Sequence, residues 1–307
     1  MYEYMVEHFT QNKLRWVNLK NPTLDEVKKV VDELNIPFLL TNDLNTPVPK
    51  NSAQEIDSII KITLDFPVVK RIDITHPYEV KFIIAKHSLL TIQYEEMEGI
   101  DRFKRQFEVA TTLRKNQKGL TGAHLFMSLI NHLYDSASTK LDYIETKLGD
   151  IESEIFKNNE KEMVSNISDV SKKLITFRHI TRSHEDVFRE AGPLFQSVYK
   201  DTFAKDLQNI QVHYFTLLRR TNTLFDTLTA LRETNTAMLS TRQNEIIKNL
   251  TLMAFITFPL SLLSSMFGMN VVSAPIIGKD GDFWIIVGIM LCAMAGFFVF
   301  FKRKGWL

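Results

Sequence analysis

Short apolar runs alternate with prolines in the first third of the chain, and this texture predicts a mixed α and β domain over residues 1–118. Apolar residues at helical spacing in 24–34, just after the Asn21-Pro22-Thr23 turn, predict one helix, and 100–116 predicts another. Runs rich in β-branched residues predict strands at 15–19, 56–66, 78–86 and 88–95. The expected domain is a small sheet flanked by helices.

Beyond residue 118 the apolar spacing becomes helical over long stretches. Residues 125–156 and 163–191 both carry apolar side chains every three or four positions, which is typical of helices with one buried face. The polar sequence "KNNEKE" (157–162) between them indicates a hairpin tip, so we expect the two helices to pair antiparallel. This helical hairpin is assigned to residues 119–202.

A still longer helix is predicted next, because no Gly or Pro occurs from Leu194 to Phe258. One continuous helix of that length would measure about 100 Å, which exceeds any globular core. The part over 203–249 is mostly polar, so we expect a stalk that leads into a membrane. Pro259 follows inside the apolar part and is expected to kink the helix.

Two charge-free apolar segments, 250–267 and 283–301, are long enough to span a bilayer. Cations flank their outer ends: Arg242, Lys248, Lys302, Arg303 and Lys304. The connecting segment 268–282 holds a single cation, so the positive-inside rule places both termini in the cytosol. The start of the chain has no apolar run of signal-peptide length. These patterns predict a cell-membrane protein with two spans and a short basic tail, 302–307.

Composition removes several classes of function. With 37 Lys and Arg against 36 Asp and Glu, the net charge of +1 gives no basis for a nucleic-acid partner. A single cysteine, Cys292, allows no internal disulfide and no cysteine-based metal cluster. The sequence contains no Walker A loop, dinucleotide-binding turn, nucleophile elbow or H-E-x-x-H motif. We therefore expect no enzyme and no cofactor, and energy from an ion gradient.

The candidate chemistry lies where the first apolar segment ends, in Gly268, Met269 and Asn270. One pair of spans encloses no aqueous path, so a pore needs several copies around an axis. A ring of Asn270 side-chain oxygens would accept hydrogen bonds from the water shell of a divalent cation without removing that shell. Gly268 is expected to let the backbone leave helical geometry. Helical spacing back from Asn270 predicts a pore face of Ser265, Ser261, Phe258, Leu250, Ile247 and Asn244.

Three stretches together resemble the CorA family of divalent metal ion transporters: "FGMN" at 267–270, "RQNEIIKNLT" at 242–251 and "FKRKGWL" at 301–307. The order of segments along nearly the whole chain is also similar to that family. The resemblance implies a homopentameric channel for magnesium, often also for cobalt or nickel. It also implies that Gly268, Met269 and Asn270 match the selectivity motif. Asn244, Leu250, Phe258 and Ser261 match its pore-lining positions.

The chain departs from the family pattern at two places near the motif. Phe267 stands where the family usually has tyrosine, and the loop "VVSAPIIGKDGD" (271–282) replaces an acidic one. Family members also sense cytosolic magnesium, which closes the channel by feedback, through carboxylates between neighbouring subunits. Asp65, Asp206 and Glu233 are the positions in this chain that we assign to that sensor, and Asn209 stands at another sensor position.

Other interpretations of the same residues stay open. Asn270 is also a suitable helix C-cap, and Ser261 and Ser265 also suit a helix interface. Leu250 and Phe258 also suit a lipid-facing surface, and the three sensor carboxylates also suit an ordinary solvated face. The function is then magnesium transport, transport of zinc or cobalt by the same architecture, or membrane anchoring of a cytosolic domain.

Overall fold

The computed structural model describes the chain except for residues 1–4, 12, 42, 49–50, 68–76, 114–119, 270–280 and 307. The chain divides into two compact units, residues 1–235 and residues 236–307. Helix α5 (Ala204–Phe267) begins in the first unit and ends in the second.

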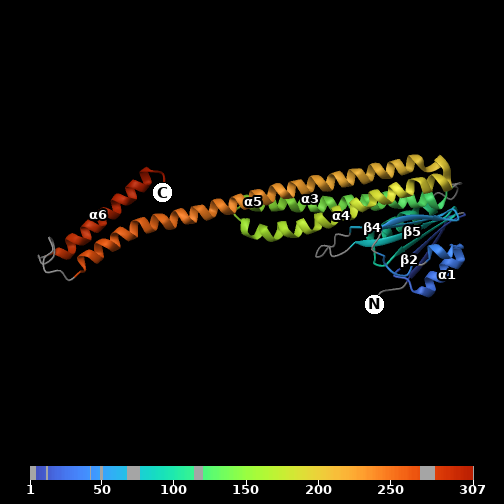
Figure 1. Cartoon of the computed structure of the whole chain (residues 1–307), viewed down its shortest axis with the longest axis horizontal. Helices are drawn as coiled ribbons and strands as arrows, with labels where there is room; N and C mark the ends of the chain where they lie inside the picture. Colours follow the sequence, from blue (N-terminus) through green and yellow to red (C-terminus); the bar gives the residue numbers. More distant parts are fainter. Residues whose placement is uncertain are drawn as a thin grey trace. The chain divides into compact units, whose positions relative to one another are not determined.

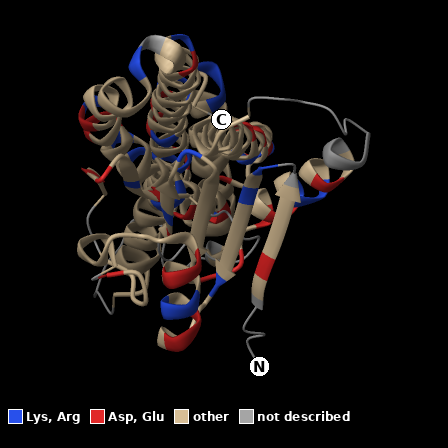
Figure 2. Cartoon of the chain, turned by 90° about the vertical axis from the view of Figure 1, so that its right-hand side faces the viewer, with Lys and Arg blue, Asp and Glu red and all other residues tan. Residues whose placement is uncertain are grey.

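The first unit contains a six-stranded sheet with the strand order β1-β2-β6-β5-β4-β3 (Figure 1). Its strands are β1 (Met5–Gln11), β2 (Leu14–Lys20), β3 (Ser52–Ile56), β4 (Ile59–Phe66), β5 (Tyr78–Ile84) and β6 (Ser88–Gln93). Only β2 and β6 pair in parallel; the other neighbours are antiparallel. The strands carry both acidic and basic positions (Figure 2). The predicted small sheet flanked by helices is confirmed.

Helices cover both faces of this sheet, because consecutive strand residues point to opposite faces. Val27 and Val30 of α1 (Leu24–Leu34) pack against one face, in a core cluster that includes Ile83. On the other face, the ring of Phe82 lies 5.2 Å from that of Phe126 in α3 (Gly122–Phe156). Helices α2 (Glu98–Leu113) and α4 (Glu160–Tyr199) contact this second side.

The start of α1 follows from its sequence as predicted. The hydroxyl of Thr23 accepts a hydrogen bond from the amide of Glu26, and the Glu26 carboxylate accepts one from the amide of Thr23. This capping box satisfies two amides that the first turn of a helix leaves without partners.

Helices α3 and α4 form the predicted hairpin and run side by side (Figure 1). Within the first unit, α5 packs on them through residues spaced three and four apart, a seam of the coiled-coil type. The buried members are Ile210, Tyr214, Leu217, Thr221, Leu224, Leu228, Leu231 and Asn235. Arg220 of α5 binds Asp142 and Glu145 of α3, and Arg178 of α4 lies over the ring of Phe225. The polar part of α5 is therefore partly buried against the hairpin.

One expectation for the long helix was wrong. Helix α4 continues through Gly192 and Pro193 to Tyr199, and the chain then turns at Lys200, where φ is 57°. A 3₁₀ turn, η2 (Lys200–Phe203), leads into α5. No Gly or Pro marks this break. It is held instead by Phe203, which is 1% exposed and packs edge-on against the rings of Tyr199 and His124.

The strand predictions also needed correction. The strand expected over 56–66 begins only at Ile59, as β4, because Asp57 and Ser58 have positive φ and turn the chain from β3, a strand that ends at Ile56 and was not predicted. Strand β1 was not predicted, nor was the short 3₁₀ helix η1 (Phe38–Leu40). Both β1 and β3 lie at the edges of the sheet, where one side pairs with no neighbouring strand and the apolar pattern is weak.

The second unit contains the end of α5 and helix α6 (Asp282–Arg303). Both are long and apolar enough to span a membrane, as predicted. Helix α6 runs back along α5 in the opposite direction (Figure 1). Helix α5 continues through Pro259 without interruption.

Candidate functional site

One face of the apolar part of α5 is covered by α6. Leu252 is 5% exposed and Leu260 is 9% exposed, although the surrounding positions are open. Ile256, Pro259, Leu263 and Phe267 are half-buried. These six residues fall within about 100° of one another around the helix and form a single stripe, which we call the α6 seam.

The predicted pore residues lie on the opposite face of α5. Leu250, Phe258, Ser261 and Ser265 each precede a residue of the α6 seam by two positions, and two positions correspond to about 200° around a helix. All four are exposed in the single chain, with Leu250 at 61% and Phe258 at 72%. Asn244 and Ile247, further toward the stalk, are also exposed. The structure therefore gathers the predicted pore residues on one uncovered face.

The predicted selectivity motif begins where α5 ends. The amide of Gly268 donates to the carbonyl of Ser264 at 2.9 Å, which continues the helical bonding, and Met269 donates to Met266 at 3.4 Å. We expected the backbone to leave helical geometry at Gly268, but the helical bonding continues through this residue. A Cβ atom at Gly268 would lie 3.2 Å from the Ser264 carbonyl oxygen, which is a tight contact. Asn270 lies outside the described residues.

Aromatic residues stand at both ends of α6. Trp284 is 73% exposed near its start, and Trp306 is 49% exposed just after its end. From Trp284 to Arg303 the helix measures about 29 Å, close to the thickness of a hydrocarbon core. Trp is enriched at membrane interfaces. The cations Lys302 and Arg303 lie in the last turn of α6, close in sequence to Trp306.

Asp65, a predicted sensor residue, lies on β4 directly opposite Glu79 of β5. Burial, and then the Glu79 carboxylate, raise the pKa of Asp65 to about 6, against the opposing effect of nearby His179. A carboxylate whose pKa is raised in this way is stabilised when a cation or a proton neutralises its charge. Both carboxylates line a cavity of about 770 Å³ between the sheet and α4, which His179 and Ser183 also line.

His184 of α4 fixes the backbone of Asp65. Its Nε2 lies 2.6 Å from the carbonyl oxygen of Asp65, and its Nδ1 lies 2.8 Å from the hydroxyl of Tyr134. A carbonyl only accepts, so Nε2–H donates to Asp65 and Nδ1 accepts from Tyr134. Burial lowers the pKa of His184 to about 4, which keeps the ring neutral. Sequence analysis gave His184 no role, because its partners lie 50 and 119 positions away.

The other two predicted sensor carboxylates lie far from each other. Asp206 is half-buried in the first turn of α5, and Glu233 is exposed 27 positions later. That separation is about 40 Å along the helix. Among the described residues, no group of three or more His, Cys, Asp and Glu side chains could hold a metal ion. The three predicted sensor residues therefore form no joint site within the described part of one chain.

A family model described as "CorA-like Mg2+ transporter protein" matches residues 11–303. The chain belongs to this family. Because the CorA family consists of ion transporters, the protein is a membrane transport protein for divalent cations and not an enzyme.

Known relatives of the CorA family cover nearly the whole chain. The cobalt/magnesium transport protein CorA of Thermotoga maritima is 22% identical over 298 residues, which are 95% of this chain and 83% of that protein. The complete structure of the CorA magnesium transporter from Methanocaldococcus jannaschii matches with a TM-score of 0.82 at 20% identity, over 97% of this chain and 93% of that one. The full-length CmaX protein matches with a TM-score of 0.71 at 12% identity, over 95% and 89%. These structural matches show a shared fold.

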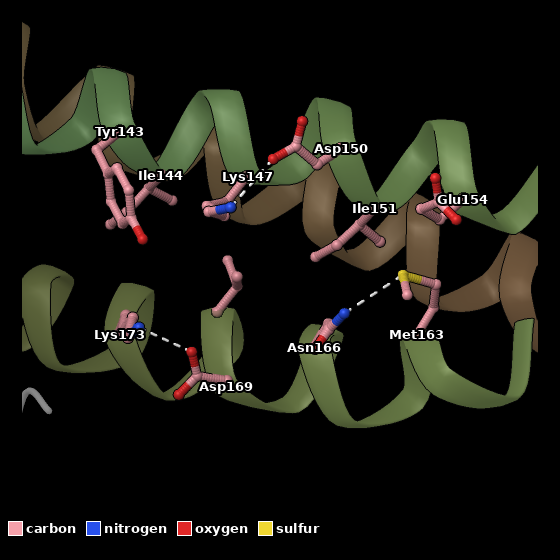
Figure 3. Close-up of a pocket in the computed structure, with 11 residues that line it drawn as sticks. Tyr143, Ile144, Lys147, Asp150, Ile151, Glu154, Met163, Asn166, Asp169 and Lys173 are labelled. Carbon is pink, nitrogen blue, oxygen red and sulfur yellow. Dashed lines mark hydrogen bonds and ion pairs between the residues drawn. The ribbon is translucent and has the colours of Figure 1, made fainter. Parts of the chain in front are cut away.

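In a cation transporter, any pocket lined with carboxylates is a candidate cation site, and one lies between α3 and α4 (Figure 3). Its volume is about 270 Å³. Asp150 pairs with Lys147 at 3.1 Å, and Asp169 pairs with Lys173 at 2.7 Å. Glu154 pairs with Lys157. Because lysines of the same helices or their ends already neutralise these carboxylates, the pocket is a poor cation site.

Proposed function

We propose that this CorA-family protein is a channel for hydrated divalent cations, with magnesium as the principal ion, formed by a homopentamer around the apolar part of α5. One observation carries the proposal: α6 covers one face of this helix, and the opposite face bears the predicted pore residues. A span that packs α6 on one side can line an axis with the other. With two spans, both ends of the chain lie on the same side of the membrane, and we assign that side to the cytosol.

Assembly follows from the exposure of this face. Two helices enclose no lumen, so the face of one chain becomes a pore wall only when copies of the chain bring such faces together. Lipid would cover Leu250 and Phe258 equally well, but Ser261 and Ser265 on the same face favour water. In the closed state, rings of Leu250 and Phe258 exclude water and bar a cation that keeps its hydration shell.

Selection is assigned to a ring of Asn270 side chains at the end of the helix. Neutral amide oxygens bind the first water shell without the tight binding that a carboxylate ring would produce. The amide of Gly268 continues the helical bonding, and a Cβ atom there would lie 3.2 Å from the Ser264 carbonyl oxygen, which supports a defined backbone immediately before that ring.

Feedback by cytosolic magnesium is assigned to Asp65, Asp206 and Glu233. Repulsion between carboxylates of neighbouring subunits would be offset by a bound cation, which would hold the subunits together and favour the closed state. The raised pKa of Asp65 supports this assignment, because burial and the facing Glu79 carboxylate disfavour its charged form, and a bound cation would offset that effect.

The test is uptake by purified protein in liposomes that contain a metal-sensitive dye, with magnesium, cobalt, nickel and zinc compared. The T. maritima relative is described as a cobalt/magnesium transport protein, so we expect magnesium and cobalt to enter. Uptake of zinc alone would support the alternative, a zinc transporter of the same architecture. Asn270→Ala should abolish uptake in an intact oligomer, whereas Asn222→Ala, at an exposed position of α5, should not. Near-normal uptake by Asn270→Ala would overturn the selectivity assignment.

A further inference from the structure

The end of α6 adopts a complete Schellman motif. Gly305 has a φ of 70°, its amide donates to the Lys302 carbonyl at 3.1 Å, and the Trp306 amide donates to the Phe301 carbonyl at 3.0 Å. Glycine adopts this left-handed conformation without steric cost. Apart from its two chain neighbours, no described residue has a heavy atom within 4 Å of a Cβ atom built on Gly305, so the requirement is for backbone conformation rather than space.

This motif folds Trp306 back onto the helix. The rings of Trp306 and Phe301 are stacked, with centroids 5.9 Å apart and planes at 14°. Phe301 is 4% exposed and also stacks on Phe297 at 6.4 Å. On its other side, Phe301 meets Phe255 of α5, with centroids 6.4 Å apart. We call these four residues the aromatic clamp.

The aromatic clamp contacts α5 at the level of the proposed rings of Leu250 and Phe258. Phe255 follows Leu250 by five residues and precedes Phe258 by three, which are about 7.5 Å and 4.5 Å along the helix. It lies on the flank of α5 between the α6 seam and the pore face. Lys302 and Trp306, at the other end of the clamp, suit the membrane interface. The clamp thus connects a point fixed at the interface to the helix that carries the rings.

We propose that Gly305 and Trp306 are positioning residues that hold α5 in place, so that the rings of Leu250 and Phe258 seal in the closed channel. This inference rests on the proposed channel function. Gly305 permits the turn, Trp306 packs Phe301, and Phe301 holds Phe255. Without that chain of contacts α5 has more freedom at the level of the rings, and water and cations leak past them.

The test compares two disruptive variants with two conservative ones in liposomes that contain high internal magnesium. Trp306→Ala removes the stack, and Gly305→Val disfavours the left-handed turn. Trp306→Phe keeps an aromatic ring, and Gly305→Asn keeps a residue that tolerates positive φ. The disruptive pair should raise the leak roughly 2- to 10-fold, the change expected when one aromatic pair is lost, while the conservative pair stays near wild type. Flux at low internal magnesium should be unchanged in all four.

Three outcomes would overturn the inference. In the first, Trp306→Ala and Gly305→Val form intact oligomers that leak no more than wild type; if Gly305→Val fails to assemble, Trp306→Ala decides alone. In the second, the conservative variants leak as much as the disruptive ones, which would mean that neither the ring nor the turn is responsible. In the third, the wild type carries no cation at low internal magnesium, which would overturn the channel proposal itself and this inference with it.

Discussion

Two titratable residues in contact, Asp65 and His184, respond to pH in opposite directions. Asp65 has its pKa raised from 3.8 to about 6, so its contribution to stability is complete below about pH 3.8 and is lost as pH rises through about 6. His184 has its pKa lowered from 6.5 to about 4, so its contribution is present above 6.5 and is lost as pH falls through about 4. Between about pH 4 and pH 6 the effects of the two residues on the free energy of unfolding partly cancel.

Removal of the Asp65 carboxyl group should expose the response of His184. We expect the melting temperature of Asp65→Asn to fall more steeply than that of wild type as pH decreases from 6.5 to 4.5, because the acid-favoured contribution is gone. Scanning calorimetry of the full chain in detergent measures this. Asp57→Asn, at the exposed turn between β3 and β4, is the control and should follow wild type. Parallel curves for Asp65→Asn and wild type would contradict the raised pKa.

The surroundings of Asp65 could be predicted from the sequence only in part. Asp65 could be selected from sequence as an acidic residue in a predicted strand. Its setting could not, because Glu79 faces it through strand pairing and His184 reaches it from α4. Such contacts depend on tertiary structure, which local apolar spacing does not encode.

At the scale of the element, the apolar part of α5 should contain the barrier to leak. Leu250→Gly and Phe258→Gly should each raise the leak at high internal magnesium at least about tenfold, since a ring of bulky side chains is lost from the pore axis. Dye-loaded liposomes measure it. Met253→Gly, at a 65% exposed position about 60° around the helix from Leu250 and about 140° from Phe258, carries the same glycine penalty and should leak less than either variant. If both variants leak no more than Met253→Gly, the barrier lies elsewhere.

The elements that sequence predicted well are those whose signal is local. Both spans follow from the absence of charge, and the hairpin follows from helical spacing around a polar tip. The break at Lys200 was missed because breakers were taken to be Gly or Pro, whereas packing of Phe203 produces it. Helix α4 tolerates Pro193 inside it for the same general reason, since tertiary contacts outweigh a local preference.

At the scale of the whole molecule, one chain presents an uncovered face, which the proposed homopentamer would bury around its axis. We therefore expect native mass spectrometry in detergent to give about 178 kDa, five times the chain mass of 35.6 kDa. Alanine at Leu252 of the α6 seam is the comparison, because that residue is already buried within a single chain and its substitution should leave the mass unchanged. Cation flux from a species with the mass of one chain would contradict assembly as the origin of the pore.

The central claim is that the face of α5 opposite the α6 seam lines the water path, and cysteine accessibility tests it most directly. Cys292, the one cysteine in the sequence, is first replaced by serine. Single cysteines then go to the pore face and to the seam, in pairs two residues apart: 250 and 252, 258 and 260, 261 and 263, 265 and 267. With internal magnesium low, a charged, membrane-impermeant thiol reagent should block most of the flux at the first position of each pair and little at the second. Block at the seam positions, or at both positions of every pair, would contradict the account.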